Sequence, residues 1–111
     1  MIVMRTLRSY GVPVYVTELD MDMSSLGGTQ ESRILRQAAM YKIVTDAMLA
    51  SGVCRSISFW GAVDGFSFPE SLGHQNAEPL LFDRNLNHKP AYYAVSSVLL
   101  EYLRSTRQTS P

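Results

Sequence analysis

Two carboxylates follow an apolar run near the start of the chain, in the stretch VYVTELDMDM at residues 14–23. Glu18 and Asp20 are two residues apart, so they share one face of a β-strand if the strand continues that far. Residues 14–17 are apolar or β-branched on both faces, which is typical of a strand in a parallel sheet covered on both sides. Because the carboxyl ends of such strands carry the chemistry of α/β proteins, both acids are candidate catalytic residues. The alternative is that they mark a solvated strand end or cap the next helix.

A second apolar run, CRSISFWG at residues 54–61, ends in the chain's single tryptophan, Trp60. A tryptophan at the end of a strand most often belongs to the core. The single cysteine, Cys54, has no partner for an internal disulfide, and its apolar surroundings predict a buried thiol. The two histidines and this cysteine lack the spacing of metal ligands, so we expect no metal site.

The elements that must position these residues follow from hydrophobic spacing and from glycine and proline positions. Apolar residues recur every three or four positions between Ile34 and Met48, which predicts a helix that Gly52 closes. Pro90 suits the first turn of a last helix. The expected order is helix 1–9, strand 13–19, helix 31–50, strand 54–61, a long connection over 62–88 and a helix from residue 90. This order predicts an α/β fold with two parallel βα units that follow the end of a helix.

Composition limits the class of protein. The chain has 111 residues, with 46% hydrophobic and 18% charged residues, which suits one globular domain. Its 10 basic and 10 acidic residues balance, so no basic surface predicts nucleic-acid binding. No apolar run is long enough to predict a membrane span, and the first ten residues do not resemble a secretory signal.

Four blocks of the sequence resemble glycoside hydrolase family 10 endo-β-1,4-xylanases, in that family's order. VTELDM resembles the nucleophile strand, QAAMYKIVTDAML the following helix, ISFWGAVDGFSF the last barrel strand with its loop, and PLLFD with KPAYYAV the closing loop and helix. The resemblance covers residues 8 to 104 and implies the seventh and eighth units of a (β/α)8 TIM barrel. We therefore expect residues 1–104 to form the C-terminal part of a catalytic barrel and residues 105–111 to form a polar tail.

The resemblance also implies roles for particular residues. Glu18 corresponds to the catalytic nucleophile, and Asp20 orients a supporting histidine that lies outside this chain. Trp60 lines the sugar site nearest the scissile bond, and Phe68 stands where the family usually places a second tryptophan over the same site. The implied ligand is β-1,4-linked xylan or xylo-oligosaccharide, and no cofactor is implied.

The resemblance places the acid/base glutamate of the family on the fourth barrel strand and the supporting histidine on the sixth, which are outside these residues. A complete barrel needs about 250 residues, so we expect a fragment that is inactive without the N-terminal barrel portion. Asp64, Glu70 and Glu78 are poor substitutes for the missing acid because they sit in the long loop. The presumed parent enzyme is expected to be secreted, because it acts on a polymer.

Two further hypotheses stay open at this stage. One is a non-catalytic carbohydrate-binding or structural remnant, in which Glu18, Trp60 and Phe68 make only weak sugar contacts. The other is a related retaining (β/α)8 glycosidase with another specificity, such as a β-glucanase.

Overall fold

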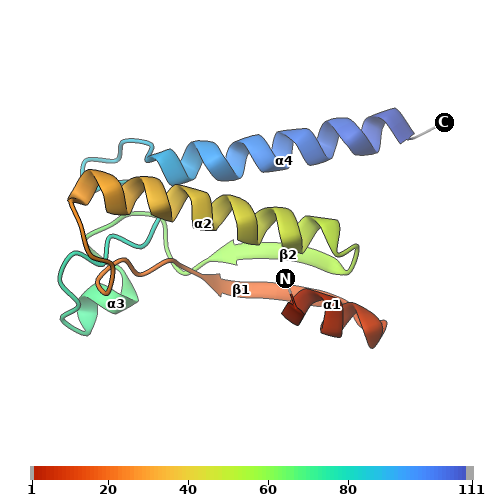
Figure 1. Cartoon of the computed structure of the whole chain (residues 1–111), viewed down its shortest axis with the longest axis horizontal. Helices are drawn as coiled ribbons and strands as arrows, with labels where there is room; N and C mark the ends of the chain where they lie inside the picture. The colour runs from red at the N-terminus through yellow and green to blue at the C-terminus, as the bar shows by residue number, and fades with distance from the viewer. Residues whose placement is uncertain (1, 110–111) are drawn as a thin grey trace.

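A computed structural model describes residues 2–109 of the chain. Two parallel strands lie side by side, the long helices α2 and α4 pack against each other, and the short helix α3 lies in the connection between β2 and α4 (Figure 1). The elements are α1 Ile2–Ser9, β1 Val14–Leu19, α2 Gln30–Ala50, β2 Cys54–Phe59, α3 Phe68–Ser71 and α4 Pro90–Thr109. The predicted order of helix, strand, helix, strand and helix is confirmed, with α3 as an addition.

The two strands pair in parallel, as predicted for consecutive βα units. Val14 lies opposite Cys54 and Leu19 lies opposite Phe59, but the register shifts between Val16 and Leu19. β1 ends at Leu19, so Asp20 lies beyond the strand. The strand does not continue as far as Asp20, so Glu18 and Asp20 do not share a strand face.

The core forms where α2, α4 and the strand ends meet. Tyr41, Ala91 and Val95 are buried together, and Leu19 and Phe59 pack against them. The Tyr41 hydroxyl donates to the Pro79 carbonyl oxygen at 2.6 Å, which satisfies the one polar atom of this large side chain. The core thus fixes the ends of both strands and the part of the long connection around Pro79.

Local sequence explains where the helices begin. Thr29 caps α2, because its hydroxyl oxygen accepts a hydrogen bond from the Ser32 N–H at 3.1 Å. The helix therefore begins at Gln30, one residue before the prediction. Pro90 is the first residue of α4, as predicted, and its missing N–H costs nothing there.

The structure differs in detail from the sequence predictions at three places. Residues 105–109, expected in a polar tail, continue α4 to Thr109, and only residues 110–111 of that tail lie outside the described part. Cys54, expected to be buried, is partly exposed at the start of β2, where it lines a small cavity with Thr45 of α2 and Val95 of α4. β2 ends at Phe59 rather than at residue 61, and Trp60 follows the strand directly.

Candidate functional site

The ends of β1 and β2 bring two of the predicted site residues into neighbouring positions. The Trp60 N–H donates to the Leu19 carbonyl oxygen at 2.9 Å, so Trp60 lies beside the residue that follows Glu18. The side chains of Glu18 and Trp60 are both exposed. An acid and an aromatic surface are therefore presented to solvent at the carboxyl ends of adjacent parallel strands.

Asp20 is partly buried just beyond β1. Burial raises the pKa of this carboxyl, and the neighbouring charge of Asp22 raises it further. A carboxylate in such a place is stabilised by a hydrogen-bond donor or a positive charge.

Phe68 meets Trp60 edge to face. The ring centroids of Trp60 and Phe68 are 6.1 Å apart and the ring planes cross at 89°, a favourable arrangement for two aromatic rings. Trp60 is 39% exposed and Phe68 is 53% exposed, so both rings keep area for a ligand. The structure thus brings together two rings that are eight residues apart in the sequence.

Helix α3 carries Phe68 as its first residue and is capped by reciprocal contacts. The Glu70 N–H donates to the Ser67 hydroxyl oxygen at 3.4 Å, and that hydroxyl donates to Glu70 Oε1 at 2.6 Å. Ser67 is followed three residues later by Glu70, which is a capping-box spacing. That spacing is a signal from which the sequence analysis could have predicted α3.

The long connection is fastened to α4 by a buried ion pair. Lys89 Nζ lies 2.7 Å from Asp64 Oδ2 and also donates to the carbonyl oxygens of Glu78 and Leu80, each at 2.8 Å. Burial raises the pKa of Asp64 despite the hydrogen bond and charge of Lys89. Asp64 therefore has a structural role in the long connection. The sequence analysis did not predict that Lys89 is its buried partner.

A hydrogen bond joins the two connections at the carboxyl ends of the strands. His74 Nδ1, in the connection between β2 and α4, lies 2.7 Å from Asp22 Oδ2, in the connection between β1 and α2. His74 is exposed, but it is paired with Asp22, which sequence reasoning could not foresee for residues 52 positions apart.

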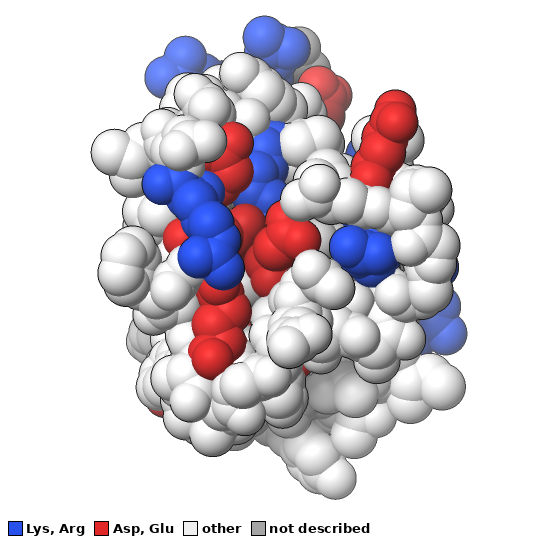
Figure 2. Space-filling model, turned by 90° about the vertical axis from the view of Figure 1, so that its left-hand side faces the viewer, with Lys and Arg blue, Asp and Glu red and all other residues white. Residues whose placement is uncertain are grey.

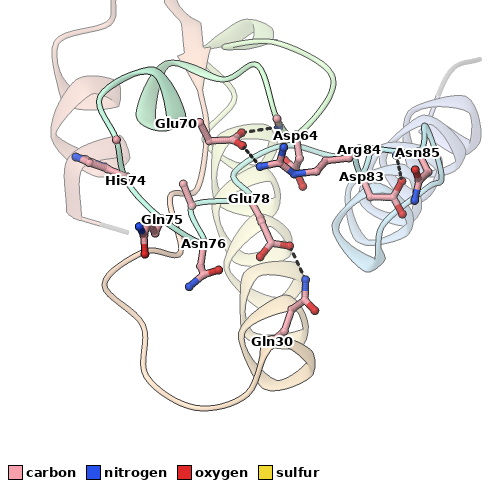
Figure 3. Close-up of a pocket in the computed structure, with 13 residues that line it drawn as sticks. Gln30, Asp64, Glu70, His74, Gln75, Asn76, Glu78, Asp83, Arg84 and Asn85 are labelled. Carbon is pink, nitrogen blue, oxygen red and sulfur yellow. Dashed lines mark hydrogen bonds and ion pairs between the residues drawn. The ribbon is translucent and has the colours of Figure 1, made fainter.

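A polar cavity of about 810 Å³ is lined mostly by residues of the long connection, and Glu18, Trp60 and Phe68 are not among its lining residues. Figure 2 views this end of the molecule and shows acidic and basic side chains gathered near the middle of the face. The side chains in the cavity are largely engaged with each other, as Glu70 is with Arg84 and Glu78 with Gln30 (Figure 3). Residues that line it include Gln30, Asp64, Glu70, His74, Glu78 and Arg84.

No group of three or more His, Cys, Asp or Glu side chains within residues 2–109 is arranged to hold a metal ion. None of the helices described there is both long and apolar enough to span a bilayer.

Fold and site together define an α/β protein of consecutive βα units, with an acid and paired aromatic rings at the carboxyl ends of its strands. The chain belongs to glycosyl hydrolase family 10, whose family model matches residues 2–98. The resemblance inferred from the four sequence blocks is confirmed, and so is the fold class of a partial (β/α)8 barrel.

Individual proteins of known name and structure agree with this membership. The chain is 32% identical over 94 residues to endo-1,4-beta-xylanase B of Thermotoga neapolitana, covering 85% of this chain and 27% of that protein. It is 41% identical over 91 residues to exoglucanase XynX of Acetivibrio thermocellus, covering 81% of this chain and 8% of that protein.

A solved structure shows the same arrangement of elements. Xylanase 10B from Thermotoga petrophila, crystallised in complex with xylobiose, superposes with a TM-score of 0.75 at 31% identity, covering 88% of this chain and 31% of that chain. The 111 residues thus span less than a third of the length of these three proteins.

Proposed function

We propose that these residues are the C-terminal part of the catalytic barrel of a retaining endo-β-1,4-xylanase, with Glu18 as the nucleophile. The observation that carries the proposal is the Trp60 N–H bond to the Leu19 carbonyl oxygen, because it sets the strand end that bears Glu18 beside the aromatic pair. Family membership and the xylanase relatives support the substrate class.

In the proposed reaction, the Glu18 carboxylate attacks the anomeric carbon of a bound xylosyl unit while the glycosidic oxygen leaves. A glycosyl-enzyme ester forms, and water then hydrolyses it with net retention. A second carboxylic acid must protonate the leaving oxygen, and in retaining enzymes it lies about 5–5.5 Å from the nucleophile. That acid comes from barrel units outside these residues, so the chain alone has no competent pair.

Asp20 acts beside the nucleophile as a positioning residue. Its raised pKa, caused by burial and by the charge of Asp22, suits a carboxyl that receives a donor from elsewhere in the barrel. In the proposal that donor is an imidazole N–H, whose ring in turn hydrogen-bonds the nucleophile. A hydrogen bond to the ionised form of a carboxylate favours that form.

Trp60 and Phe68 form the aromatic wall of the sugar site next to the scissile bond. An aromatic face suits the C–H-rich face of a pyranose ring, and the exposed areas of both rings leave room for that contact. The xylobiose bound to the Thermotoga petrophila enzyme supports a xylo-oligosaccharide as the ligand. Because its substrate is a polymer, the parent enzyme is proposed to act outside the cell.

A β-glucanase is the second candidate function. The 41% identity to a protein named an exoglucanase favours it. Xylose and glucose units differ by the hydroxymethyl group on C5, so the two candidates differ in the space that they need beside the aromatic wall. Parallel assays on xylan and on β-1,4-glucan with the completed barrel distinguish them.

The test of Glu18 uses a completed barrel, in which the N-terminal units of Thermotoga petrophila xylanase 10B precede this chain. Glu18→Gln is expected to remove nearly all turnover of xylan, because the amide is almost isosteric and cannot act as the nucleophile. Glu31→Gln, on the exposed first turn of α2, is the matched control and should leave turnover unchanged.

Mass spectrometry gives a second measurement on the same protein. A 2-deoxy-2-fluoro-xyloside with a good leaving group should label the peptide that contains Glu18, because the fluorine slows both steps whereas the good leaving group speeds only the formation of the ester. Full turnover by Glu18→Gln, or a label on another peptide, would show that the nucleophile is wrongly assigned.

A further inference from the structure

Glu70 receives three hydrogen-bond donors from three parts of the long connection. Its Oε1 accepts from the Gly65 N–H at 2.7 Å and from the Ser67 hydroxyl at 2.6 Å. Its Oε2 accepts from Arg84 Nη2 at 2.9 Å (Figure 3). The Glu70 side chain is only 11% exposed. The carboxylate is therefore a junction between the start of the connection, α3 and the segment that returns to α4.

Phe68 depends on this junction for its position. It is the first residue of a four-residue helix, and a helix of one turn cannot stabilise itself because the cost of nucleation exceeds the gain from its few hydrogen bonds. Ser67 precedes Phe68 and Glu70 follows it by two positions, so both of its flanks are tied to the same carboxylate. Hydrogen bonds to an ionised group are about twice as strong as neutral ones.

Arg84 completes the junction by close packing. Gly65 has φ +103°, and a Cβ built on it would lie 3.0 Å from Arg84 Nη1, so the guanidinium occupies the space that a side chain would need. The absence of a side chain at Gly65 thus leaves room for the Arg84 guanidinium to reach Oε2 of Glu70, while Ser67 contacts Oε1.

We propose that Glu70 is a positioning residue that, together with Arg84, holds Phe68 edge-on against Trp60 and so shapes the aromatic wall. The part of this inference that concerns sugar binding rests on the proposed function. The part that concerns the aromatic pair rests only on the contacts within this chain. Glu70 acts through Phe68 and makes no contact with substrate.

Trp60 is the only tryptophan of the chain, so its fluorescence reports on the aromatic pair directly. The experiment compares the full chain with Glu70→Gln at one concentration, after size-exclusion chromatography has shown the same association state. In Glu70→Gln, an NH2 group replaces one oxygen of the carboxylate. That group would face a hydrogen-bond donor and could not accept from it. We expect a red-shifted Trp60 emission, a larger acrylamide quenching constant and a weaker near-UV circular dichroism signal of Trp60.

Three further variants make the result specific. Phe68→Ala should produce the same spectral changes and so identify them with loss of the ring contact. Glu78→Gln is the matched control, because Glu78 lines the same cavity and accepts from Gln30 Nε2 at 2.9 Å without touching α3. It should leave the Trp60 spectra unchanged. Arg84→Met should give a smaller change than Glu70→Gln, because the Gly65 and Ser67 donors remain.

A Trp60 signal in Glu70→Gln equal to that of the unmodified chain would overturn the proposal, and so would an equal change in Glu78→Gln. An unmodified chain whose Trp60 is already quenched as strongly as in Phe68→Ala would overturn it too. A second experiment, xylobiose titration of the completed barrel, separates this inference from the proposed function.

Glu70→Gln should weaken xylobiose binding by about two- to tenfold, the range expected for loss of one aromatic contact. Changed Trp60 spectra without xylobiose binding in any variant would leave Glu70 as a positioning residue and reject the sugar site.

Discussion

Lys89 Nζ lies 2.7 Å from Asp64 Oδ2, and both side chains are almost completely buried, with Asp64 1% and Lys89 4% exposed. The ammonium group has three acceptors, and the other Asp64 oxygen accepts from the Leu80 N–H at 2.9 Å. This pair joins the residues that follow Trp60 to the start of α4. The connection that carries Phe68 is thus attached to the start of α4, the helix whose Ala91 and Val95 belong to the core.

Lys89→Met should destabilise the fold strongly. Removing one partner of a buried pair leaves an uncompensated charge, which costs about 3–5 kcal/mol of the free energy of unfolding. Urea unfolding at a fixed chain concentration, followed by Trp60 fluorescence, measures the loss. Lys42→Met on the exposed surface of α2 is the control. The double variant Lys89→Met with Asp64→Leu should recover part of the loss, because no charge is then left buried. Equal unfolding midpoints for Lys89→Met and Lys42→Met would refute the role of the pair.

The aromatic pair should be insensitive to pH until the solution is strongly acidic. Burial acts to raise the pKa of Glu70, but hydrogen bonds from Ser67 and Gly65 and the charge of Arg84 outweigh it and hold the pKa below the ordinary 4.5. A carboxyl with a lowered folded-state pKa contributes stability that is complete above the ordinary value and is lost as the pH falls through the lower folded value. Acrylamide quenching of Trp60 should therefore stay constant from neutral pH to about 4.5 and rise only below it. In Glu70→Gln this step should be missing, and a rise near neutral pH in the unmodified chain would contradict the assignment.

Phe68→Trp in the completed barrel should strengthen binding of xylo-oligosaccharides by about 1 kcal/mol, the scale of added aromatic contact. Indole offers a larger face and an N–H donor at the same position. Isothermal titration with xylobiose and xylotriose measures the change. Phe66→Trp is the matched control, because Phe66 is nearby in the loop and 91% exposed. Weaker binding by Phe68→Trp would mean that this ring does not cover a sugar.

The isolated chain should not hydrolyse xylan above background. Glu18 without an acid to protonate the leaving oxygen cannot complete the first step at a useful rate. Release of reducing sugar by the purified chain is the measurement, with Glu18→Ala as the blank. Sugar release that Glu18→Ala abolishes would mean that a second acid lies within these 111 residues.

The isolated chain should also self-associate in solution. Within the described residues, β1 and β2 pair only with each other, so each has an outer edge with unpaired backbone groups. The surface adds apolar side chains, such as Tyr15 at 61%, Leu100 at 53% and Leu103 at 51% exposed. A formal net charge of zero gives little repulsion between copies. Size-exclusion chromatography with light scattering at micromolar concentration checks this, and a monodisperse monomer with one sharp thermal transition would disprove it.

Sequence by itself determined the order of the elements and the positions of Glu18 and Trp60 at the strand ends. Hydrophobic spacing and helix-terminating residues are local signals, so they place α2 and α4 within one residue of their observed starts. The four motif blocks were sufficient for the family, because their order and composition are readable without coordinates. The alternation rule does not reach Asp20, because β1 ends at Leu19 and the end of a strand cannot be read reliably from local sequence.

Only the tertiary structure decided which side chains hold the site together. Asp64 with Lys89, Asp22 with His74, and Glu70 with Arg84 are separated by 25, 52 and 14 positions, and nothing in a linear pattern pairs one charge with another at such distances. The edge-to-face contact of Trp60 with Phe68 likewise could not be read from the linear sequence. These contacts depend on the path of the long connection, whose carbonyl groups at Glu78 and Pro79 accept hydrogen bonds from Gln37 and Tyr41 of α2. Local propensity determines where helices and strands form. The contacts within the site depend instead on how segments that are distant in the sequence pack together.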